Sequence, residues 1–327
     1  MNDWVLLRVA AASGVGRGQL NGPGWLSVSH GLYARQGSEQ SLLDKCRHLG
    51  LVLPAGAAMS HFTSGSLRGM WLPNLPEWLP VLATLPPDTD RPERRGLYVA
   101  RSRAGTPPAD IIGGVPVLTP EHTLGQLAED LGLVDLVAAI DCALHQSMCD
   151  QLDIIRSIRS RQRGLPMLRR ALTLCDSRSE SPWETFLRLV HTAVGIPVSP
   201  QEFIEDQRRR IVARADLRIV GTRRLPEYDG ADHRGRSRHQ ADLEREKALA
   251  RLNFERYGYI AKEIVDQPGQ IIRDAEEALG WRHDAERLHA WRSLAAESSL
   301  TAAGRRRLLR RLHRFNRPLR NRRDRAA

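Results

Sequence analysis

An acidic residue inside an alternating strand pattern is the feature that most constrains the fold of this chain. Residues 211–220 alternate between apolar and polar side chains, which predicts a β-strand with one buried face. A turn at 221–223 leads to a second predicted strand at 225–229. Asp216 lies in the first strand and Glu227 in the second, 227 − 216 = 11 residues later. Because Asp is depleted in strands, we expect Asp216 to have a functional role rather than to be a surface acid of a hairpin.

Two neighbouring strands that each carry a carboxylate form a pocket of hard oxygen ligands suited to Mg²⁺ or Mn²⁺. Asp216 and Glu227 are the predicted ligands, and Asp229 is the predicted third contact. His233 follows the second strand by four residues, and an imidazole with a pKa of about 6.5 can carry a proton near neutrality. Glu184, near a predicted helix start, could orient a metal-bound water. Such a site can act on a phosphodiester.

Each of these residues also has a plain structural interpretation. Glu227 could be a turn residue beside two arginines, and Asp229 could make an Asx turn before a glycine. His233 could be a solvated loop residue, and Glu184 could act as a helix cap that complements the helix dipole. Both interpretations of each residue stay open at this stage.

Positive charge is concentrated at the C-terminus. The net charge is +11, and residues 286–327 contain 13 Arg and three acids, which gives 13 − 3 = +10. Such a tail predicts phosphate binding, although a general arginine bias (46 Arg against three Lys) is the alternative. Apolar residues at 308, 309, 312 and 315 predict an amphipathic helix, whose basic face could also meet an anionic membrane surface. The predicted nucleic-acid contacts are Arg245, Lys262, Arg305, Arg306, Arg307, Arg310, Arg311 and Arg314.

Cysteine spacing and hydropathy indicate a cytoplasmic protein that does not span a membrane. The four cysteines form no CxxC pair, which favours reduced, buried thiols. No 18-residue window is wholly apolar, and no basic segment followed by an apolar run begins the chain. P-loop, GxGxxG, HExxH and GxSxG motifs are absent, so nucleotide-cofactor and serine-hydrolase functions lack support.

The predicted organisation has four parts. Residues 1–150 form a mostly helical α+β domain, 151–180 a helical linker, 181–285 an α/β domain and 286–327 an arginine-rich tail. The clearest helix start is Ser181-Pro182-Trp183-Glu184, with a capping serine and a proline in the first turn. A long charged helix is predicted at 238–257, after the second strand.

These motifs resemble those of a known family. Ser181-Pro182-Trp183-Glu184, Arg214-Ala215-Asp216-Leu217 and Glu227-Tyr228-Asp229-Gly230 with His233 resemble relatives of the very-short-patch repair endonuclease, within the PD-(D/E)XK nuclease superfamily. The resemblance spans about 180–270. Farther upstream, Ser60-His61-Phe62-Thr63 and Gly114-Val115-Pro116-Val117 look like AbiEi-type antitoxin proteins of actinobacteria.

The resemblance implies a restriction-endonuclease-like α/β/α core and a Mg²⁺- or Mn²⁺-dependent endonuclease or nickase acting on DNA. It also implies no small-molecule cofactor besides the metal, and a toxin partner or a homodimer as possible assemblies. Two departures favour an alternative, a catalytically inactive DNA-binding regulator of the antitoxin type. Pro226 precedes Glu227 in the predicted strand, and the strand arginine of the family has no clear counterpart except Lys262. An RNA-acting nuclease is a third hypothesis, since a carboxylate–metal site does not exclude a 2′-OH.

Overall fold

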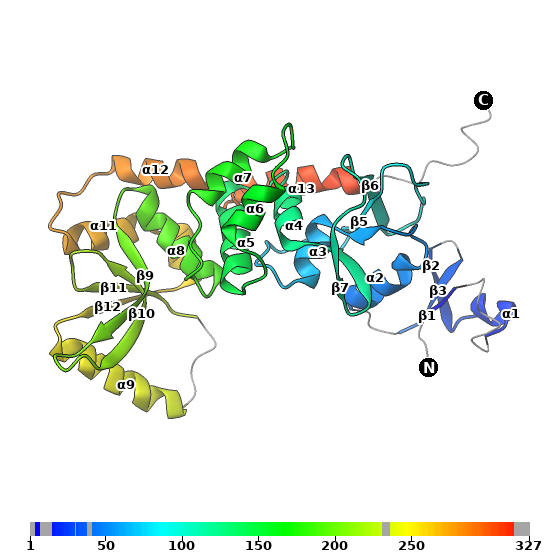
Figure 1. Cartoon of the computed structure of the whole chain (residues 1–327). Coiled ribbons are helices and arrows are strands. Elements are labelled where there is room, and N and C mark those ends of the chain that lie inside the picture. The colour runs from blue at the N-terminus through cyan, green and yellow to red at the C-terminus, as the bar shows by residue number, and fades with distance from the viewer. Residues whose placement is uncertain (1–3, 7–14, 30, 38–40, 231–235, 317–327) are drawn as a thin grey trace. The chain divides into compact units, whose positions relative to one another are not determined.

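The computed structural model describes residues 4–6, 15–29, 31–37, 41–230 and 236–316 (Figure 1). The chain forms two compact units. The first comprises residues 1–127 together with 309–327, and the second comprises residues 128–308. The expected mixed α/β class is confirmed. No helix among the described residues is long and apolar enough to cross a membrane.

The first unit begins with a small antiparallel sheet where the sequence showed only weak patterning. Its strands pair in the order β1-β3-β2, and along the chain helix α1 lies between β1 and β2. The bounds of these elements are β1 Trp4–Leu6, α1 Arg17–Leu20, β2 Trp25–Ser29 and β3 Leu32–Arg35.

The main sheet of the first unit is mixed and has the order β6-β5-β4-β8-β7. Its parallel pairs are β5–β6 and β4–β8, and the other two pairs are antiparallel. Helix α2 packs against its apolar side, where Cys46 and Leu49 join the core. The strands are β4 Ala58–Met59, β5 Val81–Leu85, β6 Leu97–Arg101, β7 Ala109–Ile112 and β8 Val115–Leu118; the helices are α2 Leu42–Gly50, α3 His61–Leu67 and α4 Pro120–Leu127.

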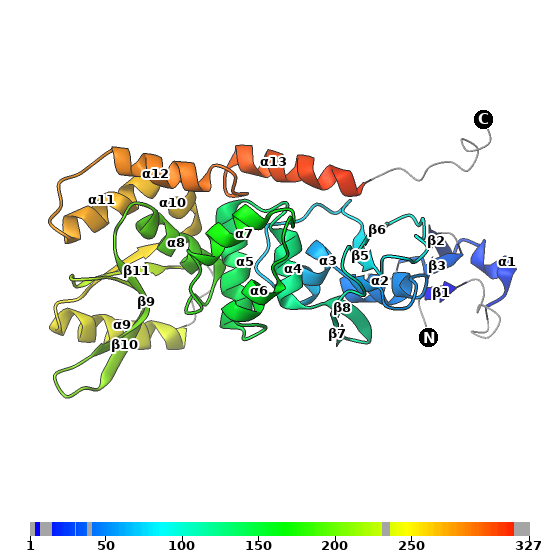
Figure 2. The same cartoon turned by 45° about the horizontal axis from the view of Figure 1, so that its top comes forward.

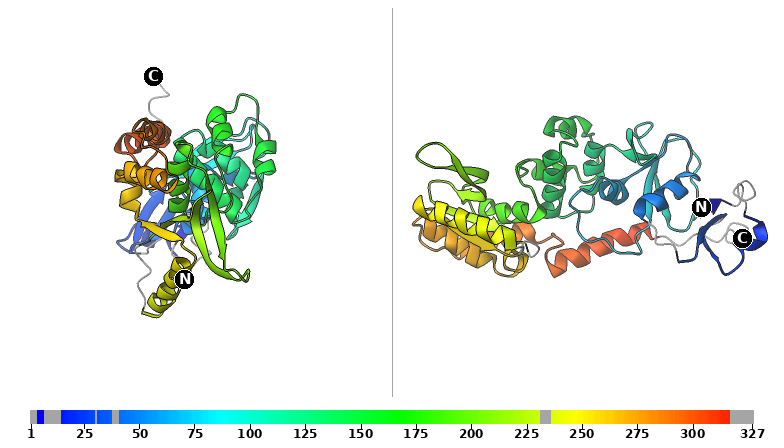
Figure 3. Two further views of the ribbon diagram at one scale, coloured as in Figure 1. Left: turned by 90° about the vertical axis from the view of Figure 1, so that its left-hand side faces the viewer. Right: turned by 90° about the horizontal axis from the view of Figure 1, so that it is seen from below.

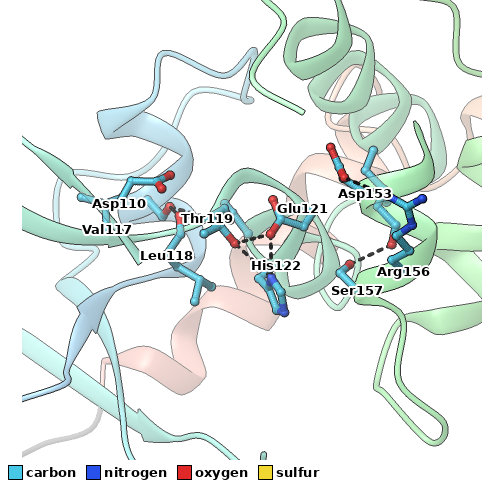
Figure 4. Close-up of polar contacts among 12 residues, drawn as sticks. Asp110, Val117, Leu118, Thr119, Glu121, His122, Asp153, Arg156 and Ser157 are labelled. Atoms are coloured by element: carbon cyan, nitrogen blue, oxygen red, sulfur yellow. Dashed lines mark hydrogen bonds and ion pairs between the residues drawn. The ribbon is translucent and has the colours of Figure 1, made fainter. Parts of the chain in front are cut away.

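A polar network fixes the start of α4. The Thr119 hydroxyl lies 2.6 Å from Glu121 Oε1 and 2.9 Å from His122 Nδ1 (Figure 4). Beside it, Arg68 pairs with Asp110 at 2.6 Å and donates to the Leu118 carbonyl. These contacts tie the helix start to the end of the sheet.

The second unit opens with helices built around α5, most of whose residues are buried. Gly164, at φ 73°, precedes α7 in a left-handed conformation and lies against Ala128, so a side chain at this position would clash. On α6, Asp153 and Arg156 form an ion pair at 3.8 Å (Figure 4). The bounds are α5 Leu133–His145, α6 Gln151–Ser157 and α7 Leu165–Leu172.

Strands and helices alternate through the rest of the second unit. Helix α8 packs on one side of the strands and α9 on the other, and α10 and α11 lie against α8 (Figure 2). Strands β9 and β10 form an antiparallel hairpin, and β11 pairs with β12 in parallel. The elements are α8 Pro182–Ala193, β9 Val198–Glu205, β10 Ile211–Ile219, β11 Arg224–Tyr228, α9 Arg236–Arg251, β12 Glu255–Tyr259, α10 Ala261–Asp266 and α11 Pro268–Ala278.

The predicted helix at 238–257 is too long at its C-terminal end. Helix α9 ends at Arg251, and β12 begins at Glu255. Asn253 adopts φ 58°, and the Phe254 N–H donates to the Leu249 carbonyl at 2.9 Å. This is the left-handed helix ending that Asn, after Gly, accepts best. The structure therefore has a strand where the sequence interpretation had the last turns of a helix.

The described part of the arginine-rich tail, residues 286–316, is mostly helical. It forms α12 Glu286–Ala295, α13 Ala302–Leu312 and a short 3₁₀ turn, η3 His313–Phe315. The expected amphipathic character of α13 is confirmed, because Leu308 and Leu312 are buried. Asp135 holds the turn between α12 and α13, accepting from Ser298 Oγ at 3.0 Å and from the Ser299 N–H at 2.8 Å.

Candidate active site

Glu227 is the centre of a carboxylate–arginine cluster in the second unit. Its side chain is 3% exposed. Its Oε1 lies 2.5 Å from Arg245 Nη2 on α9, and its Oε2 lies 2.5 Å from Arg256 Nε on β12. Glu227 belongs to a strand and not to a turn, and two guanidinium groups compensate its charge.

Asp216 reaches the same region from β10. Its Oδ2 accepts the Tyr228 N–H at 2.8 Å, and Arg245 Nη2 also donates to the Arg214 carbonyl at 2.8 Å. Strand alternation by itself puts Asp216 and Glu227 on different faces, since Glu227 shares a face with Leu225, which packs against Ala215. Asp216 nevertheless stays linked to Glu227, because the Tyr228 N–H joins the Asp216 carboxylate to β11 and Arg245 joins Glu227 to the Arg214 carbonyl of β10.

Pro226 does not interrupt the β11–β12 ladder. The Arg223 carbonyl and the Asp229 N–H both bond to β12, so the odd-numbered residues direct their backbone groups toward that strand. Pro226 and Tyr228 therefore face β10, where the Tyr228 N–H meets the Asp216 carboxylate instead of a backbone carbonyl. The missing N–H of Pro226 lies on the side where no ladder forms within the described residues, which explains why β10 and β11 belong to separate sheets.

Glu184 approaches from the start of α8. The expected cap is confirmed, because Ser181 Oγ accepts the Glu184 N–H at 3.2 Å. The Glu184 carboxylate accepts from the Glu180 N–H and from Gln201 Nε2, each at 2.8 Å. Gln201 lies on β9 opposite Asp216 and has φ 52°, a strained conformation for a residue other than glycine. Gln201 thus links the Glu184 carboxylate to the strand position facing Asp216.

Asp229 lies at the exposed end of the cluster. Its Oδ1 is 2.7 Å from Arg256 Nη2. A Cβ atom added to Gly258 would lie 1.8 Å from Asp229 Oδ2, so only glycine at position 258 leaves room for this carboxylate. His233, the predicted proton carrier, lies outside the described residues.

Burial and mutual repulsion raise the pKa values of three of these carboxyl groups. Burial is the largest cause for Asp216, Glu227 and Glu184. The negative charge of Asp216 raises the pKa of Glu227 and that of Glu184 further, while Arg245 and Arg256 oppose the rise at both Asp216 and Glu227. The shared influence of the same two arginines shows that Asp216 and Glu227 belong to one electrostatic cluster.

The charges of this cluster do not balance. Four carboxylates (Glu184, Asp216, Glu227 and Asp229) against two arginines (Arg245 and Arg256) give −4 + 2 = −2 when all are ionised. Among the residues that the structure describes, no three His, Cys, Asp or Glu side chains are arranged to share an ion. Mg²⁺ is nevertheless commonly held by one or two carboxylates, with waters and substrate phosphates completing its shell. Asp216 and Glu227 therefore fit such an ion in ligand type and in charge.

The remaining predicted contacts are distributed over several surfaces. Arg245 lies inside the cluster, while Lys262 is exposed at the start of α10. On α13, Arg307 pairs with Glu297 at 3.0 Å, and Arg306 and Arg310 are exposed. Arg305, Arg311 and Arg314 are partly buried on α13 and η3.

The sequence interpretation missed two residues of the site. Arg256 stands on a strand and pairs with both Glu227 and Asp229, whereas the sequence interpretation named Lys262, which lies on α10. Asn253 could have revealed Arg256, because an Asn that ends the helix leaves residues after it free to form the strand that carries Arg256. Gln201 had no signal in the sequence, because its role depends on the register of β9 against β10.

Comparison with other proteins shows two relatives. Uncharacterized protein Rv2248 of Mycobacterium tuberculosis strain ATCC 25618 / H37Rv and uncharacterized protein MT2308 of strain CDC 1551 / Oshkosh are each 24% identical to this chain over 256 residues. The similar region covers 77% of this chain and 92% of each relative. No known protein-family model matches the chain.

Proposed function

We propose that this protein is a metal-dependent endonuclease or nickase that hydrolyses phosphodiester bonds of DNA, and that its second unit contains a restriction-endonuclease-like core. The observation that carries the proposal is the excess of negative charge around Glu227, which is buried, and Asp216, which is half-buried. The two arginines do not supply enough positive charge to neutralise the carboxylates, and one divalent cation would supply the rest. The layering of α8 and α9 on opposite sides of the strands is in keeping with such a core.

Asp216 and Glu227 would hold Mg²⁺ or Mn²⁺, which when bound polarises a phosphate and activates water. Arg256 lies between Glu227 and Asp229 and can place positive charge beside phosphoryl oxygens. Glu184 has a raised pKa and can accept a proton from a water near Asp216. His233 is the proposed second proton carrier.

Plasmid cleavage tests the proposal. Purified full-length protein with Mg²⁺ or Mn²⁺ should nick or linearise supercoiled plasmid, and Asp216→Asn should lower the rate at least about a thousandfold, or about 4 kcal/mol in the barrier. Glu244→Gln is the matched control, because Glu244 is an exposed acid on α9 next to Arg245 and outside the cluster. Equal cleavage by wild type and Asp216→Asn would refute the site.

A second readout does not depend on cutting. Metal binding to the folded state should raise the free energy of unfolding by about 2.7 kcal/mol at a hundredfold excess over Kd. The same titration of Asp216→Asn should give a much smaller shift, and Glu244→Gln should behave as wild type. A shift that is identical in all three proteins would place the metal elsewhere.

One observation favours a second candidate function, a DNA-binding regulator of the antitoxin type that does not cut and acts with a toxin partner. Both oxygens of Glu227 are engaged by arginines. If this pairing persists in the presence of metal, Glu227 is a structural anion. Sequence-specific binding near the protein's own promoter, without cleavage by the wild type in either metal, would support this function over the first.

A further inference from the structure

The β9–β10 hairpin ends in a preformed basic turn. Asp206 accepts the N–H groups of Arg208 at 2.8 Å and of Arg210 at 3.0 Å, and its own N–H donates to the Arg210 carbonyl at 2.9 Å. Arg209 is held at φ 57° between them. The turn therefore has a defined shape before any partner binds.

Two of the three arginines at this turn carry uncompensated charge. Asp206 pairs with Arg210 at 2.7 Å, so that charge is balanced. Arg208 and Arg209 are exposed and have no acidic partner among the described residues. The hairpin thus presents two positive charges at the end of a two-stranded ribbon (Figure 3).

Apolar side chains lie behind these charges. Phe203 is 56% exposed and Ile211 is 60% exposed. Phe203 stands opposite Arg214 in the register of the hairpin, and Arg214 shares its face of β10 with Asp216. One face of the ribbon therefore carries a basic end, an aromatic side chain, the exposed acid Glu205 and, farther along, a carboxylate of the candidate active site.

The length of the ribbon relates its end to that site. From Arg210 to Asp216 is six residues, or about 20 Å at about 3.3 Å per residue. Base pairs of duplex DNA follow one another at about 3.4 Å, so this length corresponds to about six base pairs.

We propose that the β9–β10 hairpin lies in the major groove of duplex DNA, with Arg208 and Arg209 on phosphates at the groove edge and Phe203 against the groove floor. The proposal rests on the nucleic-acid function proposed above. In this arrangement the turn of the hairpin contacts the duplex about six base pairs away from the phosphate that lies at Asp216. B-form DNA is the occupant because its major groove admits a two-stranded ribbon, whereas the deep, narrow major groove of duplex RNA does not.

The test measures binding of full-length protein to a labelled 30-base-pair duplex without divalent metal, across a series of salt concentrations. Arg208→Ala/Arg209→Ala should raise Kd at least about tenfold at low salt and reduce the slope of log K against log salt by about two. Arg159→Ala/Arg161→Ala is the matched control, since it also removes two exposed loop arginines, one of them at φ 62°. The control should change Kd less than about twofold.

Three outcomes would overturn the inference. The first is an unchanged Kd for the hairpin variant, and the second is an equal loss of affinity in the hairpin and control variants. The third is that the hairpin variant loses more affinity for a duplex RNA of the same sequence than for the DNA. Phe203→Ala supplies a further requirement, namely weaker binding at all salt concentrations with an unchanged slope. Matching circular dichroism and Tm among the variants ensures that folding does not cause the differences.

The two proposals fail separately. If the wild type never cuts and the hairpin variant still loses affinity, only the catalytic proposal fails. If the wild type cuts and the hairpin variant binds as the wild type does, only the hairpin inference fails.

Discussion

Two carboxylate–arginine sites of the second unit, at Asp141 and at Glu227, differ in their balance of charge. Asp141 on α5 is 0% exposed, and its Oδ2 lies 2.7 Å from Arg188 Nη2 on α8. It also accepts from Thr185 Oγ1 at 2.8 Å and from the Asp176 N–H at 2.7 Å. One anion thus meets one cation and two further donors. The Glu227 cluster instead gathers four carboxylates around two arginines.

The neighbours of each carboxylate show what the difference means. Burial raises the pKa of Asp141, but the other main influences on it, led by Arg188, lower that pKa. Glu227 is buried and Asp216 is half-buried, and each also has a nearby anion that raises its pKa further. A site whose charges are satisfied stabilises the packing of two helices, whereas a bound cation would offset the excess negative charge of the other site. Burial alone does not distinguish the two.

Removal of one arginine from each site should produce the largest contrast. Arg188→Met leaves Asp141 buried without its cation, so the free energy of unfolding should fall by about 3–5 kcal/mol. Arg245→Met leaves Glu227 with Arg256, so its loss should be clearly smaller. Urea denaturation at neutral pH measures both. Equal losses in the free energy of unfolding would mean that the charges of the Glu227 cluster are balanced as closely as those of the Asp141 site.

A larger side chain at position 258, beside the Glu227 cluster, should have an intermediate effect on stability and on cleavage. In Gly258→Ala the new Cβ would lie 1.8 Å from Asp229 Oδ2, so the carboxylate or strand β12 must move. We expect the free energy of unfolding to fall by about 1–3 kcal/mol and plasmid cleavage to fall at least about tenfold. Cleavage assays and urea denaturation on the same preparation provide the measurement.

Gly269→Ala is the control for this substitution. Its nearest neighbour would be the flexible Leu288 side chain at 3.3 Å, and alanine favours the α11 helix. Stability should be unchanged or slightly higher. If Gly258→Ala behaves as this control does, the position of Asp229 does not matter to the cluster.

Local patterns in the sequence predicted part of the Glu227 cluster and none of the Asp141 site. The alternation around Asp216 and the Ser181 cap of α8 are local signals, and both are confirmed. The partners of Glu227 could not be predicted in the same way, because Arg245 and Arg256 lie 18 and 29 residues farther along the chain. Their approach depends on where α9 ends and on the parallel register of β11 with β12. The Asp141–Arg188 pair is separated by 47 residues, and no local signal marks it.

The dependence of stability on pH gives the subtlest contrast. The folded-state pKa of Asp216 is raised above its ordinary value of 3.8, so its contribution to stability is fully present below pH 3.8 and is lost as pH rises through the folded pKa. Asp216→Asn removes this loss and can still accept the Tyr228 N–H. Its Tm should therefore exceed that of the wild type by a few degrees at neutral pH, and the difference should vanish toward pH 3.8. Asp141→Asn should gain less than Asp216→Asn at neutral pH, because burial also raises the pKa of Asp141 but the substitution leaves Arg188 buried without its counter-charge. Thermal melts of the three proteins from pH 4 to pH 8 measure both shifts. A lower Tm for Asp216→Asn at neutral pH would mean that the ionised Asp216 carboxylate stabilises the fold, and the Glu227 cluster would then have no unbalanced charge at Asp216 for a ligand to offset.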